Sequence, residues 1–237
     1  VAAGRILAWP DTIKGPPYPG LESYGFRHAA VFFGRGREVP HAVGLWRERA
    51  AAGTPFLLVV GASGSGKSSL VKAGLLPRIA TPGVIEGVDH WRMAVFRPAD
   101  DPGGPLAALV AALVASERDL PWSEEGRGPA LPELAAEDVE PADLAGLLGT
   151  DPDVAARRIV AVLDGLGRAE QASERRGSAV RVDLVLAVDQ LDELFAPTLD
   201  DARRDAFVSA LASLLRTGRI WVAATLRADL YAAMLAH

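Results

Sequence analysis

The chain alternates between short continuous apolar runs and longer stretches with helical periodicity. Four of the apolar runs have the length and the content of Val, Ile, Leu and Phe that buried strands have. A continuous apolar run is typical of a parallel strand, because such a strand is covered on both faces and carries no polar face. The pattern predicts strands over residues 56–60, 91–96, 182–188 and 220–226.

Helical periodicity fills most of the chain between these runs. Three local signals mark the ends of helices. A proline lies in the first turn of the Ala- and Leu-rich stretch from Pro105, Gly218 stops a long amphipathic segment, and Asp229 can cap a last helix. The expected helices span residues 40–52, 68–79, 105–115, 151–168 and 200–216. Strands that alternate with helices predict a three-layer α/β fold with a parallel sheet.

Two segments depart from this alternation. Residues 1–20 are rich in proline and glycine and are expected to form a linker or arm. Residues 116–150 are acidic and rich in proline and glycine, which predicts a surface insertion with short helices. The remaining chain, residues 21–237, is then expected to form one domain.

Composition and charge exclude several classes of protein. The 237 residues contain no Cys, which rules out a disulfide scaffold, a thiolate metal site and a Cys nucleophile. The net charge of -5 disfavours binding to a nucleic-acid backbone as the main activity. Since neither a secretion signal nor an apolar run long enough for a membrane span is readable, we expect a cytoplasmic protein without membrane contact.

The turn after the first predicted strand carries the most specific motif. It fits G-x-x-x-x-G-K-[ST], the Walker A pattern of P-loop NTPases. Its glycines let backbone N–H groups surround an anion at a helix N-terminus, the lysine reaches the β- and γ-phosphates, and the serine hydroxyl binds Mg²⁺. The expected nucleotide-binding residues here are Gly61, Ala62, Ser63, Gly64, Ser65, Gly66, Lys67, Ser68 and Ser69.

Acidic residues follow the strand over residues 182–188. Asp189 stands at the tip of this buried strand, where P-loop proteins hold Mg²⁺ with a Walker B carboxylate, although an Asp can also simply end a strand. Asp192 and Glu193 are candidates for the group that orients or deprotonates the attacking water, with a slight preference for Glu193. The alternative for both is that they complement the dipole of a helix.

A cationic side chain follows the strand over residues 220–226. Arg227 is expected at the carboxyl end of the sheet, where ligands bind in open α/β folds, and it could contact the γ-phosphate. The alternative is a solvated Arg227 that pairs with Asp229.

In several blocks the chain resembles the novel STAND NTPase domains of bacterial signalling and conflict proteins. The resemblance covers about Pro17 to Tyr231, and the blocks that carry it are Pro17–Leu21, Phe32–Glu38, the phosphate loop, Gly74–Pro77, Asp189–Phe195 and Thr225–Asp229. The acidic block is also similar to the D-G-x-D-E signature of NACHT relatives, which supports Asp192 and Glu193.

The resemblance implies an ATP-driven switch that rests with ADP and oligomerises with ATP and Mg²⁺. Phe33, Gly34 and Arg35 would lie on the adenine and ribose side, and Arg227 would be the sensor arginine. Gln190 stands where many fast P-loop ATPases have a catalytic Glu, so a weak ATPase is implied. Effector and sensor domains would lie outside this segment, as would the fifth strand that the family's sheet carries beside the first.

Two other functions stay open at this stage. One is a nucleic-acid-linked P-loop ATPase of the loader or helicase kind, which would need a basic channel. The other is a nucleotide-clamped scaffold with negligible turnover, which would act only by binding partners.

Overall fold

A computed structural model describes residues 20, 22–114, 130–137, 140–173 and 177–235. The expected linker therefore lies outside the described residues apart from Gly20, as do residues 116–129 and 138–139 of the expected insertion. No helix in the described ranges combines the length and the apolar character that a membrane crossing requires.

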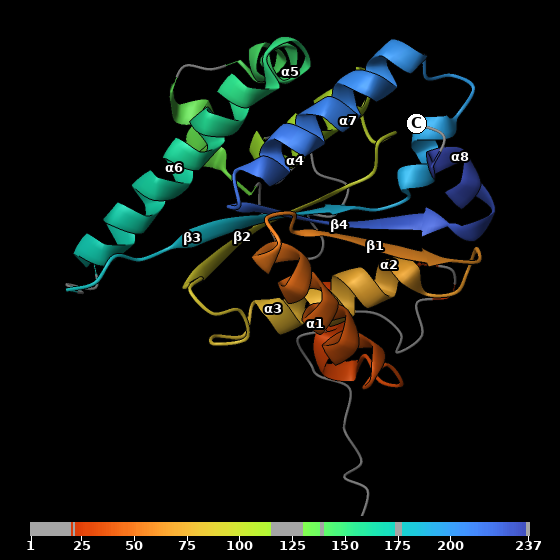
Figure 1. The fold of residues 1–237 in the computed structure, drawn as a ribbon, viewed down its shortest axis with the longest axis horizontal. Helices are drawn as coiled ribbons and strands as arrows, with labels where there is room; N and C mark the ends of the chain where they lie inside the picture. The colour runs from red at the N-terminus through yellow and green to blue at the C-terminus, as the bar shows by residue number, and fades with distance from the viewer. Residues whose placement is uncertain (1–19, 21, 115–129, 138–139, 174–176, 236–237) are drawn as a thin grey trace, which may run out of the picture.

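A parallel sheet forms the middle layer of the molecule (Figure 1). Its strands are β1 (Phe56–Gly61), β2 (His90–Phe96), β3 (Val182–Val188) and β4 (Ile220–Arg227), in the order β1-β4-β3-β2. All the pairings are parallel, as the continuous apolar runs predicted. Within the described residues β1 pairs only with β4, so it lies at an edge of the sheet.

Helices cover both faces of the sheet (Figure 1). One face carries α1 (Glu38–Ala51) and a helical segment made of α2 (Lys67–Ser69), a π-helical turn (Leu70–Leu75) and α3 (Leu76–Ile79). The other face carries α4 (Pro105–Val114), α5 (Pro141–Thr150), α6 (Pro152–Ser173) and α7 (Asp201–Arg216). The predicted three-layer α/β fold is confirmed.

Each face of the sheet has its own hydrophobic core. On β3, Leu184 and Leu186 pack into the larger cluster under α4–α7, whereas Val185 and Ala187 pack into the smaller cluster under α1–α3. Because successive side chains of a strand point to opposite faces, a strand between two cores must be apolar throughout. This explains why β3 appears in the sequence as an uninterrupted apolar run.

The expected surface insertion contributes to the larger core. Leu131, Leu134, Leu144 and Leu148 are fully buried there, although the segment looked polar enough to lie outside. Residues 132–137 form a 3₁₀-helix that packs against α4 and α6, and α5 follows with Leu144 and Leu148 on one face and packs against α4, α6 and α7. The described part of the segment is therefore packed structure rather than a surface addition.

The ends of the long helices follow local signals. Asp200 caps α7 by accepting a hydrogen bond from the backbone N–H of Arg203, and Gly218 ends the helix with a φ of 65°. The prediction for Asp229 was wrong. This residue lies inside a 3₁₀-turn (Ala228–Leu230) that leads into α8 (Tyr231–Leu235), and its side chain binds Arg227 instead of capping α8.

Candidate functional site

The carboxyl ends of the strands bring the predicted site residues to one edge of the sheet. Gly61, Val188 and Arg227 are the last residues of β1, β3 and β4, and these strands are parallel neighbours in the sheet. The phosphate-loop motif, the acidic block after β3 and Arg227 therefore lie at the same edge. This is where open α/β sheets bind ligands.

The phosphate-loop motif forms a tight turn between β1 and α2. Gly64 and Gly66 have φ values of 72° and 84°, a conformation that strains any residue with a Cβ. The ammonium group of Lys67 donates hydrogen bonds to the carbonyl oxygens of Gly61 at 3.0 Å and Ala62 at 2.8 Å. The lysine thus folds back over its own loop, at the position where phosphate oxygens would offer it stronger, anionic acceptors.

Asp189 is buried and is the centre of a small polar cluster. Its Oδ1 accepts hydrogen bonds from the hydroxyl of Ser68 at 2.5 Å and from the hydroxyl of Thr225 at 2.7 Å. Its Oδ2 lies 3.5 Å from the ammonium group of Lys72. The fold thereby joins the two predicted metal ligands, Ser68 and Asp189, which are far apart in the sequence.

The donor set of this cluster fits Mg²⁺. A hydroxyl and a carboxylate are hard oxygen ligands, and Mg²⁺ in nucleotide sites is commonly held by one or two such groups together with phosphates and water. Among the described residues no group of three or more His, Cys, Asp or Glu side chains could hold a metal alone. Ser68 and Asp189 could hold such an ion together with the phosphates of a nucleotide.

Gln190 redirects the chain directly after Asp189. Its φ of 57° is the one positive value among the described non-glycine residues, and its backbone N–H donates to the Thr225 hydroxyl at 2.8 Å. A 3₁₀-turn (Leu191–Phe195) starts here and carries Asp192 and Glu193. Such sparsely populated backbone conformations persist where the surroundings fix them, and they cluster at functional sites.

The two candidate acids have different neighbours. Asp192 accepts a hydrogen bond from the backbone N–H of Arg227 at 3.2 Å, whereas Glu193 accepts one from the backbone N–H of Ala99 at 2.9 Å. Burial raises the pKa of Glu193, although the Ala99 N–H and the charge of Arg97 partly oppose this shift. A carboxylate with a raised pKa is the better proton acceptor.

Arg227 lies at the edge of the site and is paired. Its guanidinium group donates to both carboxylate oxygens of Asp229, at 3.2 Å and 2.6 Å, on the exposed surface. This hydrogen-bonded pair raises the pKa of Arg227 and lowers the pKa of Asp229. The ion pair is the alternative that the sequence left open, and it occupies Nε and Nη2 of Arg227.

The segment before α1 packs against the phosphate loop. Arg35 donates to the backbone oxygen of Ser65 at 3.0 Å, and the backbone N–H of Tyr24 donates to the hydroxyl of Ser69 at 3.0 Å. A Cβ on Gly74 would lie 3.3 Å from a ring carbon of Phe32, which shows how closely this segment approaches the helix after the loop. Gly34 and Phe33 are exposed, with 64% of Phe33 accessible.

Three contributors to the site were not among the predicted site residues, and the first is Thr225, whose hydroxyl binds Asp189 and the backbone N–H of Gln190. Lys72 contacts Asp189, and the backbone of Ala99 after β2 binds Glu193. A signal for Lys72 existed, because it is one of three lysines in the chain and lies one helical turn after Ser68. The sequence has no signal for Ala99, because the contact uses its backbone.

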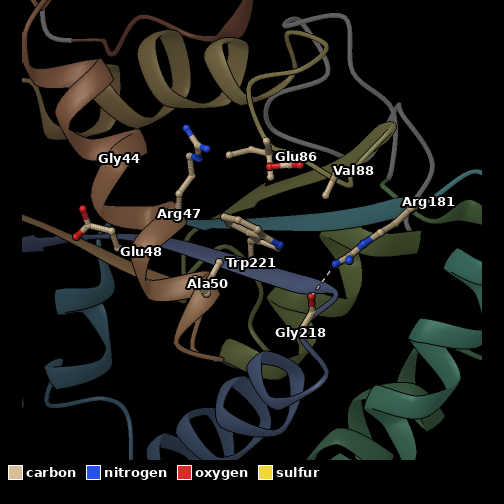
Figure 2. A pocket seen from close by; sticks show the side chains of 11 residues that line it. Gly44, Arg47, Glu48, Ala50, Glu86, Val88, Arg181, Gly218 and Trp221 are labelled. Carbon is tan, nitrogen blue, oxygen red and sulfur yellow. Dashed lines mark hydrogen bonds between the residues drawn. The ribbon is translucent and has the colours of Figure 1, made fainter.

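A separate cavity of about 650 Å³ opens at the opposite, amino edge of the sheet (Figure 2). Trp221 of β4 forms part of its lining, together with Arg47 and Glu48 of α1 and with Arg181, which donates to the backbone oxygen of Gly218 at 3.0 Å. The lining includes none of the predicted site residues. The cavity is therefore distinct from the site at the carboxyl edge.

Comparison with known proteins identifies one family. The family described as Novel STAND NTPase 1 matches residues 17–237, which is most of the chain. Neither curated proteins nor solved structures gave a match. The family assignment supports nucleotide binding at the phosphate loop.

Proposed function

Because this chain belongs to the Novel STAND NTPase 1 family, we propose that it is an ATP-binding, slowly hydrolysing regulatory module. In this proposal its nucleotide state controls self-association and signalling of an attached effector, with ADP in the resting state. The observation that carries the nucleotide-binding part is the contact of Ser68 with Asp189 directly beneath the phosphate loop.

Binding would use groups that are already in place. Lys67 would leave the carbonyl oxygens of Gly61 and Ala62 and donate to phosphate oxygens, which are better acceptors. Ser68 and Asp189 would hold Mg²⁺, which neutralises phosphate charge when it is bound. Arg35 would stay at the loop through Ser65, on the side where the resemblance puts the adenosine.

Slow hydrolysis is supported by the acidic block. Glu193 has a raised pKa and a fixed hydrogen bond to Ala99, so it can accept a proton from a water molecule. Gln190 occupies the position next to Asp189 and is uncharged, so the site has no carboxylate there. Arg227 is paired with Asp229, which offsets part of the charge stabilisation that it would add.

Calorimetry with ATP and with ADP, each with Mg²⁺, tests the proposal. The wild type should bind both nucleotides, and Lys67→Ala should weaken the affinity by about a hundredfold or more, because charge-assisted hydrogen bonds to phosphate are lost. Arg78→Ala is the matched control, since Arg78 is an exposed cation on the same helical segment and should bind as the wild type does. Equal affinities for Lys67→Ala and the wild type would contradict the site.

Turnover separates the proposal from its rivals. Single-turnover hydrolysis in the intact protein is expected to be slow but measurable. Hydrolysis stimulated by DNA would instead support a loader or helicase, and nucleotide binding without any hydrolysis would support a scaffold.

A further inference from the structure

Lys72 is the one cation within ion-pair distance of Asp189 among the described residues. Its ammonium nitrogen lies 3.5 Å from Oδ2 of Asp189, and the accessible fractions of the two side chains are 17% and 9%. A lysine this buried needs a counter-charge, because an unpaired buried charge is costly. Asp189 supplies that charge.

The fold directs Lys72 to Asp189. The lysine lies on the π-helical turn Leu70–Leu75, one turn after Ser68, so both side chains extend from the same helical segment toward the end of β3. Insertions of this kind in a helix are frequent at functional sites because they re-aim a side chain.

The other partners of Asp189 leave its negative charge largely uncompensated. Ser68 and Thr225 are neutral, and both donate to Oδ1. Arg97, which lies after the neighbouring strand β2, attracts Asp189 from a distance, but its guanidinium group is paired with Asp100 at 2.9 Å rather than with Asp189. The full positive charge in contact with Asp189 is therefore that of Lys72, on the oxygen that the hydroxyls do not use.

We propose that Lys72 is a resident cation that stands in for the divalent metal at Asp189 and lowers the site's affinity for the metal alone. This inference rests on the proposed function for the assignment of Asp189 as the metal-binding acid. A cation a few ångströms from a second, divalent cation repels it, so metal binding is unfavourable until phosphates add negative charge. Lys72 thereby makes metal and nucleotide bind together, and it acts as a positioning residue.

Binding of Mn²⁺ to the nucleotide-free protein, measured by electron paramagnetic resonance, tests this inference. Lys72→Met removes the charge and keeps most of the side-chain length, and it should tighten Mn²⁺ binding about tenfold. Lys72→Arg should bind as weakly as the wild type. Arg78→Met, which removes an exposed charge from the same helical segment, should leave the affinity unchanged.

Thermal unfolding gives a second readout that needs no nucleotide. In EDTA, Lys72→Met should melt below the wild type because Asp189 is left without a cation, and Mn²⁺ should raise its melting temperature by more than it raises that of the wild type. Unchanged, weaker or undetectable Mn²⁺ binding in Lys72→Met would overturn the inference. A wild type that fails to bind ATP would instead overturn the proposed function, and the Mn²⁺ comparison would still decide the role of Lys72.

Discussion

One buried aspartate lies near the start of strand β3 and another directly follows its end. The negative charges of the two are compensated in different ways. Asp183, near the start, is completely buried and takes hydrogen bonds from two arginines. Arg181 donates to Oδ1 at 2.9 Å and to Oδ2 at 2.8 Å, and Arg219 donates to Oδ1 at 2.7 Å. Arg219 is held in turn by Asp164 at 2.6 Å.

Asp189, after the end of the strand, has neutral hydroxyl donors and one lysine at 3.5 Å. Burial alone therefore does not separate a structural carboxylate from the one that we propose binds a metal. Asp183 has full charges in direct hydrogen-bonded contact, which leaves it little capacity to accept a further cation. The charge of Asp189 is only partly compensated, as its proposed role in holding Mg²⁺ requires.

The largest difference between the two aspartates should appear in stability. Asp183→Asn leaves Arg181 and Arg219 with a neutral partner in a buried site, and we expect the free energy of unfolding to fall by about 3–5 kcal/mol. Asp189→Asn keeps its hydroxyl partners and leaves one lysine, Lys72, without its counter-charge, so we expect a smaller loss of about 1–2 kcal/mol.

Chemical denaturation of the wild type and both variants measures this difference. The two substitutions are matched, since each replaces a carboxylate by an amide next to the same strand. Equal losses of stability would break the comparison between the two ends of β3.

A smaller, pH-dependent effect should come from Glu193, beside Asp189. Burial raises the pKa of Glu193 in the folded protein above its unfolded value, so ionisation of Glu193 disfavours folding. This cost is absent below the unfolded pKa and grows as pH rises through the folded pKa. Glu193→Gln removes the charge and keeps the acceptor for the backbone N–H of Ala99. The stability of this variant relative to the wild type should therefore rise as the pH increases from 4 to 7.

Denaturation at the two pH values checks this sign, and the gain should stay below about 1 kcal/mol because Glu193 is only partly buried. Glu48→Gln, at an exposed position on α1, is the matched substitution for comparison. A Glu193→Gln variant whose stability relative to the wild type rises as the pH falls would contradict the raised pKa of Glu193.

The sequence predicted the features of the site that depend on strand ends and on local turns. The run before Asp189 is apolar because both faces of β3 are buried, and the glycines at Gly64 and Gly66 are required by positive φ values. Both signals are local, so they can be read along the chain. The confirmed α/β layers follow from the same alternation of strands and helices. The strand order β1-β4-β3-β2 does not follow from that alternation and was not predicted.

The unpredicted features depend on contacts between distant segments. The leucines at Leu131 and Leu134 are buried because α4 and α6 leave room for them, which the polar residues around them conceal. The Arg227–Asp229 pair replaced the expected helix cap because a nearby guanidinium group is a stronger partner than backbone N–H groups. The helical spacing of Lys72 from Ser68 is a local signal. The contact of Lys72 with Asp189 also depends on how the α2–α3 segment packs beside the end of β3, which no local pattern specifies.

The Mg²⁺ dependence of ATP affinity tests the central claim most directly, because Asp189 is claimed to hold a metal that Asp183 cannot. We expect Mg²⁺ to tighten ATP binding to the wild type by at least about tenfold, measured by calorimetry with Mg²⁺ and with EDTA. Asp189→Asn should lose this gain, whereas Asp205→Asn, at an exposed position on α7, should keep it. The same Mg²⁺ effect in Asp189→Asn and in the wild type would contradict the account.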